Sequence, residues 1–362
     1  MTAVERRHGR ILLGLILAAL AVAFASLFVG RYPITPGTMV RVLAARGAEM
    51  VYGALARIQP DGALTEFAAR LVPAATWEET VETVVFSIRL PRVLLALSIG
   101  AGLSISGAAF QGMFQNPLVS PDLLGVTAGA GLGAAIGILL GGSTVAIQLA
   151  ALLCGIGAVA LTYVMSRIYR TTPTLMLVLS GIVVGSICNA LLSLAKYLAD
   201  PHDELPTIVF WLMGSLATVT RDDALHAIPP ILGGITVLLL LRWRINLLSM
   251  GDDEARALGV NPDRLKTVLI VASTLVTAAG VSVSGIIGWV GLVIPHIGRM
   301  LVGPDHRILL PVSLALGGIY LTLIDDLARA STEVEIPLGI LTAIVGAPFF
   351  AYMLRRTRGG WG

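Results

Sequence analysis

Long apolar runs recur along this chain, and they limit what it can fold into more than any other feature. A helix that spans a bilayer needs about 20 apolar residues, and ten segments of the sequence come close to that length. They are 11–30, 92–113, 122–141, 145–166, 174–196, 224–243, 265–284, 287–302, 308–328 and 336–354. The sequence therefore predicts an all-α membrane protein with about ten transmembrane helices, formed as a single domain over residues 1–362.

Composition supports a membrane protein. Only 13% of the residues are charged and 56% are hydrophobic, whereas soluble domains carry about 25% charged residues. The net charge of +3 is spread among loops, so nothing indicates a nucleic-acid partner. The first apolar run is longer than the roughly 7–15 residues of a signal peptide, and we interpret it as a retained first helix.

Basic residues give the orientation, because cytoplasmic loops are enriched in lysine and arginine. With both termini in the cytoplasm, residues 31–88 form an external loop region and residues 246–263 a cytoplasmic segment. The cytoplasmic side then holds 15 of the 25 basic residues, namely Arg6, Arg7, Arg10, Arg167, Arg170, Arg242, Arg244, Arg256, Arg264, Lys266, Arg299, Arg307, Arg355, Arg356 and Arg358.

The predicted spans lack the groups that power transport or catalysis. No carboxylate lies near the centre of a span, where a proton-coupled carrier needs one. No phosphate-binding loop is present, because neither lysine, Lys196 or Lys266, follows a glycine. The pattern favours a pore-forming subunit whose energy comes from a partner. A secondary transporter that works alone is the alternative from another class.

The cytoplasmic segment 246–263 predicts a short helix between two spans. Either Ser249 or Gly251 caps it, three acidic residues follow in its first turn, and Gly259 with Asn261-Pro262 ends it. Ala255 and Leu258 are expected on one side and Arg256 on another. Its well-marked ends favour a rigid interaction element over an ordinary surface loop.

Polar residues form one stripe along the span 174–196. Ser186, Asn189 and Ser193 are spaced i, i+3 and i+7, so they share one helix face. Two interpretations stay open: hydrogen bonds between helices of one subunit, or the lining of a path. Gly181 and Gly185, spaced four apart, predict close helix contact.

Several motifs, in consistent order, resemble the ABC importer permeases for iron–siderophore complexes, haem and vitamin B12. They run from RLPRVLLALSIGAGLSISGAAFQGMFQNPLVSPDLLGV (89–126) through FWLMGSL (210–216), GDDEARALGV (251–260) and GWVGLVIPHIGR (288–299) to DHRILLP (305–311) and EIPLGILTAIVGAPFF (335–350). The resemblance covers the chain from about residue 89 to its C-terminus, and GRYPI (30–34) also fits.

This resemblance implies a homodimer in the inner membrane, with the path at the dimer axis. It implies two cytoplasmic ATPase subunits, which bind ATP and Mg, and a periplasmic or lipid-anchored binding protein. The chain itself is then expected to be no enzyme and to bind no cofactor or metal. An iron–siderophore is the expected cargo, and haem, cobalamin and molybdate-like oxyanions remain alternatives.

The resemblance also implies roles for particular residues. The residues expected to dock the binding protein are three arginines that face outward: Arg89 and Arg92, on either side of Pro91 in the first turn of their helix, and Arg329, which follows the ninth span. The residues expected to couple the chain to the ATPase are Gly251, Asp252, Glu254, Ala255, Arg256, Leu258 and Gly259. The residues expected to line the path and form its inner gate are Thr172, Thr174, Ser186, Asn189 and Ser193.

Overall fold

The fold is helical throughout the described residues of a computed structural model, which are 3–58, 64, 77–167 and 173–356. Each of the ten apolar segments coincides with a helix, so the all-α prediction is confirmed for this part of the chain. These helices are α1 (Ala3–Ser26), α5 (Leu90–Met113), α6 (Val126–Leu139), α7 (Thr144–Ser166), α8 (Thr174–Leu198), α10 (Arg221–Leu248), α12 (Pro262–Ser284), α13 (Val290–Val302), α14 (His306–Ala330) and α15 (Leu338–Arg356).

Not all of these helices are long enough to cross a bilayer unaided. Among the described residues, seven helices have the length and apolar composition of a membrane span. The apolar helices α6, α13 and α15 are shorter, as is α9 (Glu204–Met213), which the sequence did not predict as a separate element. The count of ten crossing helices therefore stays a prediction.

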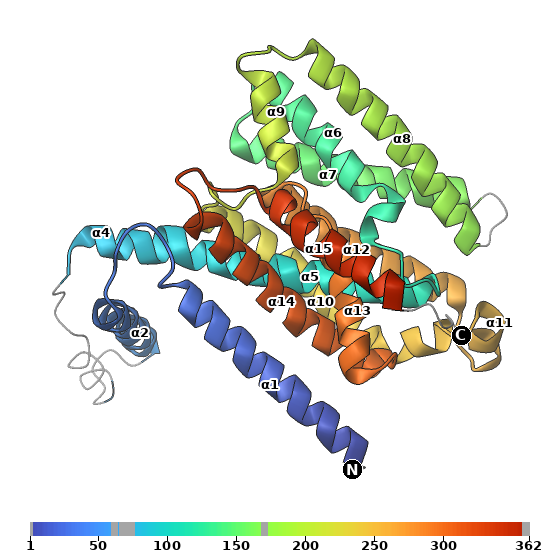
Figure 1. The fold of residues 1–362 in the computed structure, drawn as a ribbon, viewed down its shortest axis with the longest axis horizontal. Coiled ribbons are helices and arrows are strands. Elements are labelled where there is room, and N and C mark those ends of the chain that lie inside the picture. The colour runs from blue at the N-terminus through green and yellow to red at the C-terminus, as the bar shows by residue number, and fades with distance from the viewer. Residues whose placement is uncertain (1–2, 59–63, 65–76, 168–172, 357–362) are drawn as a thin grey trace.

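Helix α5 forms the centre of the bundle and packs against α10, α12, α13 and α14 (Figure 1). Glycines make these contacts close. A Cβ built on Gly107 would lie 1.9 Å from the carbonyl oxygen of Gly291, and one on Gly100 would lie 2.2 Å from that of Gly317. The α5–α13 and α5–α14 pairs therefore touch backbone to backbone, as small residues permit in membrane helices.

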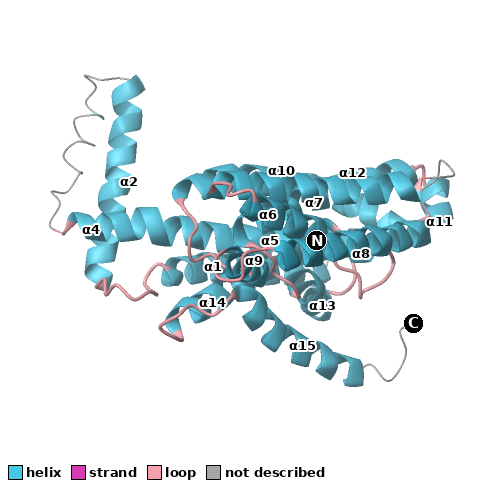
Figure 2. Cartoon of the chain, turned by 90° about the horizontal axis from the view of Figure 1, so that it is seen from above, coloured by secondary structure: helices cyan, strands magenta, loops and turns pink. Residues whose placement is uncertain are grey.

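Residues 31–88, predicted as an external loop region, contain ordered helices. Helix α2 (Pro36–Ile58) runs across the direction of the bundle in Figure 2. Its Met39 and Val42 belong to one buried cluster with Val81 and Val85, which lie in α4 (Glu79–Glu82) and the π-helical turn η1 (Thr83–Arg89). This apolar cluster anchors α2 to the element that leads into α5.

The helix of the second span begins earlier than the sequence predicted. Elements α4, η1 and α5 form one continuous helix from Glu79 to Met113, so the expected start near residue 92, with Pro91 in the first turn, is wrong. A proline inside a helix lacks an N–H and crowds the carbonyl one turn earlier. The wider π-helical turn η1 directly precedes this site, and such turns accommodate local disruption of a helix.

The bundle has two distinct ends. Figure 1 shows α2 and α4 at one end, which we name the outer end, and the short helix α11 (Asp252–Ala257) at the opposite, inner end. Helix α1 begins and α15 ends toward the inner end (Figure 1). The two ends carry the groups that the sequence singled out, namely the arginines and the segment around α11.

Candidate functional site

Six charged side chains gather at the outer end, where α5, α14 and the loop before α15 meet. Arg92 bridges two carboxylates: its Nη2 lies 2.9 Å from Oδ1 of Asp325 and 2.7 Å from Oε2 of Glu335. Its Nε also donates to Asp325, so this pairing is bidentate. We refer to Arg89, Arg92, Arg329, Asp325, Asp326 and Glu335 as the outer charge cluster.

The other two arginines of the outer charge cluster connect it to α1. Arg329 pairs with Asp326 and donates to the carbonyl of Ser26 at 2.7 Å. Arg89 donates to the carbonyls of Leu27 and Tyr32 at 2.8 and 2.5 Å. The three guanidinium groups thus bind carboxylates, the carbonyl of Ser26 at the end of α1, where a helix presents unpaired acceptors, and two carbonyls of the segment that follows it.

The three arginines do not face outward, contrary to the sequence-based prediction. Arg89, Arg92 and Arg329 are only 3%, 5% and 5% exposed. Arg92 is covered by carboxylates distant in sequence, since Asp325 and Glu335 lie 233 and 243 positions away. Arg89 and Arg329 are covered by the end of α1 and the segment that follows it, which accept their hydrogen bonds. Burying a charge costs free energy unless it is paired and hydrogen-bonded. The cluster pairs Arg92 and Arg329 with carboxylates and gives Arg89 two backbone carbonyls.

The inner end carries α11 as a separate short helix, as predicted. Gly251, at φ +134°, precedes it, and Gly259, at φ +80°, follows it, both in backbone conformations that favour glycine. Ser249 does not cap α11, because its hydroxyl bonds back to Asn246. Asn261 does not end α11 either, since its side chain caps α12 by accepting the N–H of Arg264 at 3.0 Å.

The faces of α11 differ from the expected arrangement. Ala255 is fully buried, whereas Leu258 is 57% exposed, so these residues do not share one side. Arg256 is also exposed and pairs with Asp253 at 3.0 Å. Because α11 is only six residues long and Leu258 is already its C-cap, the periodicity of a longer helix does not extend to this residue. Leu258 and Arg256 thus remain accessible to a partner.

Sequence reasoning missed the residue that ties α11 to the bundle. Lys266, on α12, is completely buried, and its Nζ lies 2.6 Å from Oδ2 of Asp252 and 3.3 Å from Oγ1 of Thr174. One ammonium group therefore joins the first residue of α11 to the first residue of α8. The available signal was its position, as one of two lysines in the chain, one turn into an apolar helix.

The predicted polar stripe on α8 lies on the surface of the chain. Ser186, Asn189 and Ser193 are all exposed. The two hydroxyls donate to α8 itself, from Ser186 to Ile182 at 2.7 Å and from Ser193 to Asn189 at 2.9 Å. Within the described part of the chain, neither serine makes the interhelical hydrogen bond that one interpretation required.

A groove of about 470 Å³ lies beside this stripe, between α8 and the turn η2 (Pro121–Leu124), and Ser186 and Asn189 line it. The contact is close because Gly181 has no side chain: a Cβ there would lie 2.1 Å from the carbonyl oxygen of Leu123. Thr172, a predicted gate residue, lies outside the described residues. Thr174, the other one, accepts a hydrogen bond from the Lys266 ammonium.

Comparison with protein families gives one match over nearly the whole chain. Residues 15–356 match the model described as the FecCD transport family. This match includes all of the predicted spans from 92 onward, most of the first, the segment 246–263 and the three arginines.

Curated relatives cover the chain to different extents. The molybdate import system permease protein MolB of Haemophilus influenzae is 39% identical over 353 residues, covering 98% of this chain and 97% of that protein. The cobalamin import system permease protein BtuC of Halobacterium salinarum is 42% identical and covers 76% and 74%. An iron chelatin transport system permease protein of Helicobacter pylori is also 42% identical and covers 77% and 85%.

A solved structure has the same fold. It is described as an inward-facing conformation of a metal-chelate type ABC transporter, and it matches with a TM-score of 0.80 and 38% sequence identity. The match covers 96% of this chain and 99% of that one. The region around α2 and the segment around α11 therefore belong to an architecture that an experimental structure shares.

Proposed function

The chain belongs to the FecCD transport family, and on that premise we propose that it acts as a homodimer with two separate ATPase subunits and a binding protein. Family membership itself makes the chain a multi-pass permease subunit of an ABC importer, located in the inner membrane. The proposal adds how the subunit is arranged, how it is driven and what it carries.

In the proposed arrangement, ten helices cross the membrane and both termini lie in the cytoplasm. Short helices such as α6 and α13 are tolerated within a membrane where other helices cover their ends. The distribution of basic residues favours a cytoplasmic inner end. The exposed stripe of Ser186, Asn189 and Ser193 on α8 would then face the second subunit and line the path between the two copies.

The bridge through Lys266 carries the proposed mechanism. An ATPase subunit that seats α11 would contact the exposed Leu258 and Arg256, and ATP and Mg would be bound on that ATPase. Motion of α11 would pass from Asp252 through the Lys266 ammonium to Thr174, the first residue of α8. Since α8 carries the polar stripe, this bridge links the ATPase surface to the path in two contacts.

We keep the docking role of Arg89, Arg92 and Arg329 as a proposal with an added condition. Because these arginines are already paired, a carboxylate of the binding protein would have to replace an internal one. Glu335 is the accessible partner, with its side chain 26% exposed, whereas Asp325 is 1% exposed. Exchange of Glu335 for a partner carboxylate would preserve the charge balance around Arg92.

A metal chelate is the proposed cargo, and an iron–siderophore, haem and cobalamin remain the candidates within that class. A molybdate-like oxyanion is a second candidate, and one observation favours it. The match to the molybdate permease spans 98% of this chain and so includes residues 31–88, whereas the matches to the cobalamin and iron chelatin permeases span about three quarters of it.

Reconstitution tests this function. The chain is placed in proteoliposomes with its cognate ATPase and binding protein, and uptake of a ferric siderophore, haem, cobalamin and molybdate is measured with and without ATP. We expect ATP-dependent uptake of one class of cargo that disappears when the ATPase is omitted. Uptake driven by an ion gradient without the ATPase would instead establish the secondary transporter.

The variant Leu258→Asp tests the coupling surface within the same assay. A carboxylate on this exposed position should weaken seating of α11 and separate ATP hydrolysis from uptake, while the exposed Leu225→Asp at the outer end should not. Normal uptake per ATP by Leu258→Asp would contradict the coupling role of α11.

A further inference from the structure

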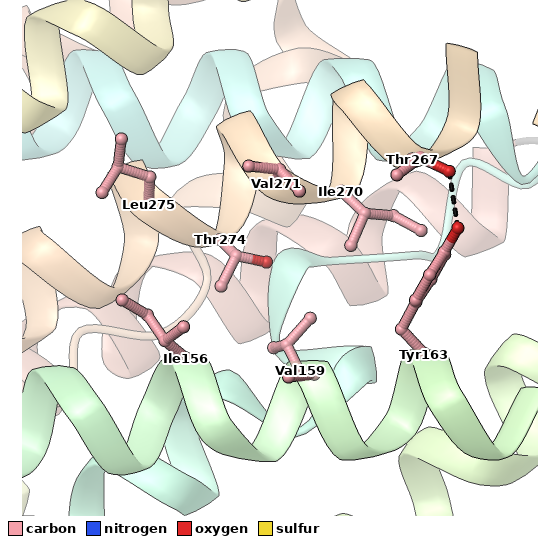
Figure 3. Close-up of a pocket in the computed structure, with 9 residues that line it drawn as sticks. Ile156, Val159, Tyr163, Thr267, Ile270, Val271, Thr274 and Leu275 are labelled. Atoms are coloured by element: carbon pink, nitrogen blue, oxygen red, sulfur yellow. Dashed lines mark hydrogen bonds between the residues drawn. The ribbon is translucent and has the colours of Figure 1, made fainter. Parts of the chain in front are cut away.

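An apolar groove between α7 and α12 is not used by the proposed transport mechanism. It has a volume of about 280 Å³. Figure 3 shows its walls, with Ile156, Val159 and Tyr163 on α7 and Thr267, Ile270, Val271, Thr274 and Leu275 on α12. Val271 is 62% exposed, so the groove opens to the side of the chain rather than into the bundle.

The polar groups of this groove gather at one end. The Tyr163 hydroxyl and Thr267 Oγ1 lie 2.7 Å apart there (Figure 3). Arg167 follows one turn after Tyr163 and stacks over its ring, with its Cζ 5.4 Å from the ring centroid. Beyond this end the lining is apolar apart from Thr274, so the groove has one polar end and one apolar body.

A second arginine stands at the same end. Arg264 precedes Thr267 by three residues and Val271 by seven, which places these positions on one stripe of α12. Neither Arg167 nor Arg264 forms an ion pair with an acidic residue in the described part of the chain. The polar end therefore offers two positive charges that no acidic residue of the described chain pairs.

The length of the groove fits one half of a bilayer. From Thr267 to Leu275 a helix rises about 12 Å at 1.5 Å per residue. The hydrocarbon of one leaflet is about 15 Å deep, half of a core of roughly 30 Å. An acyl chain that entered from the inner end would lie along the apolar walls with its headgroup near the arginines.

From this geometry we propose that the groove binds an anionic phospholipid of the cytoplasmic leaflet. The acyl chain lies between α7 and α12, and Arg167 and Arg264 bind the phosphate, as basic pockets between membrane helices bind anionic headgroups. The inference rests on the proposed orientation, which puts the inner end in the cytoplasm. A second copy of this chain is the other occupant that the groove could take, and the test separates the two.

Native mass spectrometry of the full-length chain in detergent tests the headgroup. The probes are phosphatidylglycerol and phosphatidylcholine with the same palmitoyl and oleoyl chains. We expect phosphatidylglycerol to be retained at least tenfold more strongly, and Arg167→Gln with Arg264→Gln to weaken its binding by roughly 10- to 30-fold, at about 1 kcal/mol for each basic residue near the headgroup. The matched double variant Arg242→Gln with Arg244→Gln removes two exposed arginines at the inner end of α10 and should change binding less than twofold.

Val271→Trp tests the groove itself. The larger side chain should fill the groove and reduce retention of both lipids by tenfold or more, whereas Val268→Trp, on an exposed position of α12 outside the groove, should retain them. Equal retention of the two lipids by the wild-type chain, or unchanged retention by Val271→Trp, would overturn the proposal.

Two further outcomes would identify another occupant. Competition by free glycerol phosphate as strong as that by phosphatidylglycerol would show an anion site without a lipid chain. Conversion of a dimer to a monomer by Val271→Trp would show that a second copy fills the groove. Because binding is measured without ATPase, binding protein or ATP, failure here leaves the transport proposal standing, and failure of uptake leaves this result standing.

Discussion

The two ends of the molecule hold their charges in different ways. At the outer end, three arginines and three carboxylates are paired with one another or with backbone carbonyls, and the arginines are at most 5% exposed. At the inner end, one buried lysine reaches one partly exposed aspartate and one threonine, while Leu258 and Arg256 point to solvent. The ion pairs of the outer end share their partners, whereas α11 at the inner end is held by a single buried ion pair, that of Lys266 with Asp252.

This difference indicates that the outer end is the rigid part of the molecule and the inner end the part that can move. Networks of buried polar groups that bond one another make a structure rigid. Apart from the Nε of Arg329, which has no hydrogen-bond partner in the described chain, the outer charge cluster is such a network, and it fixes α1, α5 and α14 relative to one another. The regions that move in a protein are drawn from those with fewer buried contacts. The inner end is therefore the place where the proposed ATPase subunit would displace α11 and α8 while the outer half of the bundle keeps its packing.

The largest effect is expected from breaking the outer charge cluster. Arg92→Met leaves the buried carboxylate of Asp325 without its bidentate partner, and loss of one member of a buried pair costs about 3–5 kcal/mol. Equilibrium unfolding in mixed micelles should show this loss in the free energy of unfolding. Arg46→Met, which removes an exposed pair with Glu49, should cost about 1 kcal/mol or less.

The double variant Arg92→Met with Asp325→Asn separates lost pairing from poor packing. It removes the uncompensated charge, so it should recover part of the stability. If Arg92→Met and Arg46→Met destabilise the protein equally, the outer charge cluster does not fix the outer end.

The second effect compares the close α5–α14 contact with the surface of α8. Gly100→Ala places a methyl group where the Gly317 carbonyl oxygen lies 2.2 Å away, and overpacking of this kind costs about 1–3 kcal/mol. Gly185→Ala on α8 meets nothing within 4 Å in the described chain and should leave the melting temperature unchanged. If Gly100→Ala and Gly185→Ala lower the melting temperature equally, α5 and α8 are equally tightly packed at these positions.

The third effect concerns motion rather than stability. Lys266→Met keeps a long apolar side chain but removes the ammonium that joins Asp252 to Thr174. Because Asp252 is partly exposed and can be hydrated, we expect the fold to persist while uptake per ATP hydrolysed falls about tenfold, equivalent to about 1.4 kcal/mol of coupling. Lys196→Met, at the other end of α8, is the matched control and should transport normally.

The smallest effect is expected at the helix cap beside the inner end. Asp305 is partly desolvated, but it accepts hydrogen bonds from Asn246 and from the Arg307 N–H, which hold its pKa below the ordinary 3.8. A depressed folded pKa gives stability that is complete above 3.8 and is lost as the pH falls through the folded value.

Asp305→Ala should therefore cost about 1 kcal/mol near neutral pH, the usual value of an N-cap. The difference from wild type should shrink in unfolding experiments below pH 3.8. A difference that stays constant with pH would exclude the ionised carboxylate as its source.

Much of the fold was predictable because a membrane helix can be recognised from its own stretch of sequence. Each predicted span needs only its own apolar run, and every one of these runs is helical. The helices of residues 31–88 were missed because α2 is amphipathic and has no apolar run of membrane length. The continuous helix from Glu79 was missed because Pro91 is a strong sequence signal for a helix start. The π-helical turn that permits an internal proline has no comparably strong signal in the sequence.

The site was less predictable because its contacts join distant parts of the chain. Arg92 and its partners Asp325 and Glu335 are separated by more than 200 residues, so each looked like a charge at a span end. The contact of Lys266 with Thr174 likewise spans 92 positions. The glycines around α11 were predictable, since a short helix between two turns is specified by its own residues.

Inter-subunit distances measured by spin labels test the central claim most directly, namely that α11 moves α8 through Lys266 while the outer end stays fixed. In a background with Cys154 and Cys188 replaced by alanine, single labels are placed at Leu175, at the inner start of α8, and at Glu333, at the outer end. With the ATPase present, ATP should change the Leu175 distance in the wild-type chain but not in Lys266→Met, and should leave the Glu333 distance unchanged. An ATP-dependent change at Leu175 that persists in Lys266→Met, or a larger change at Glu333, would contradict the account.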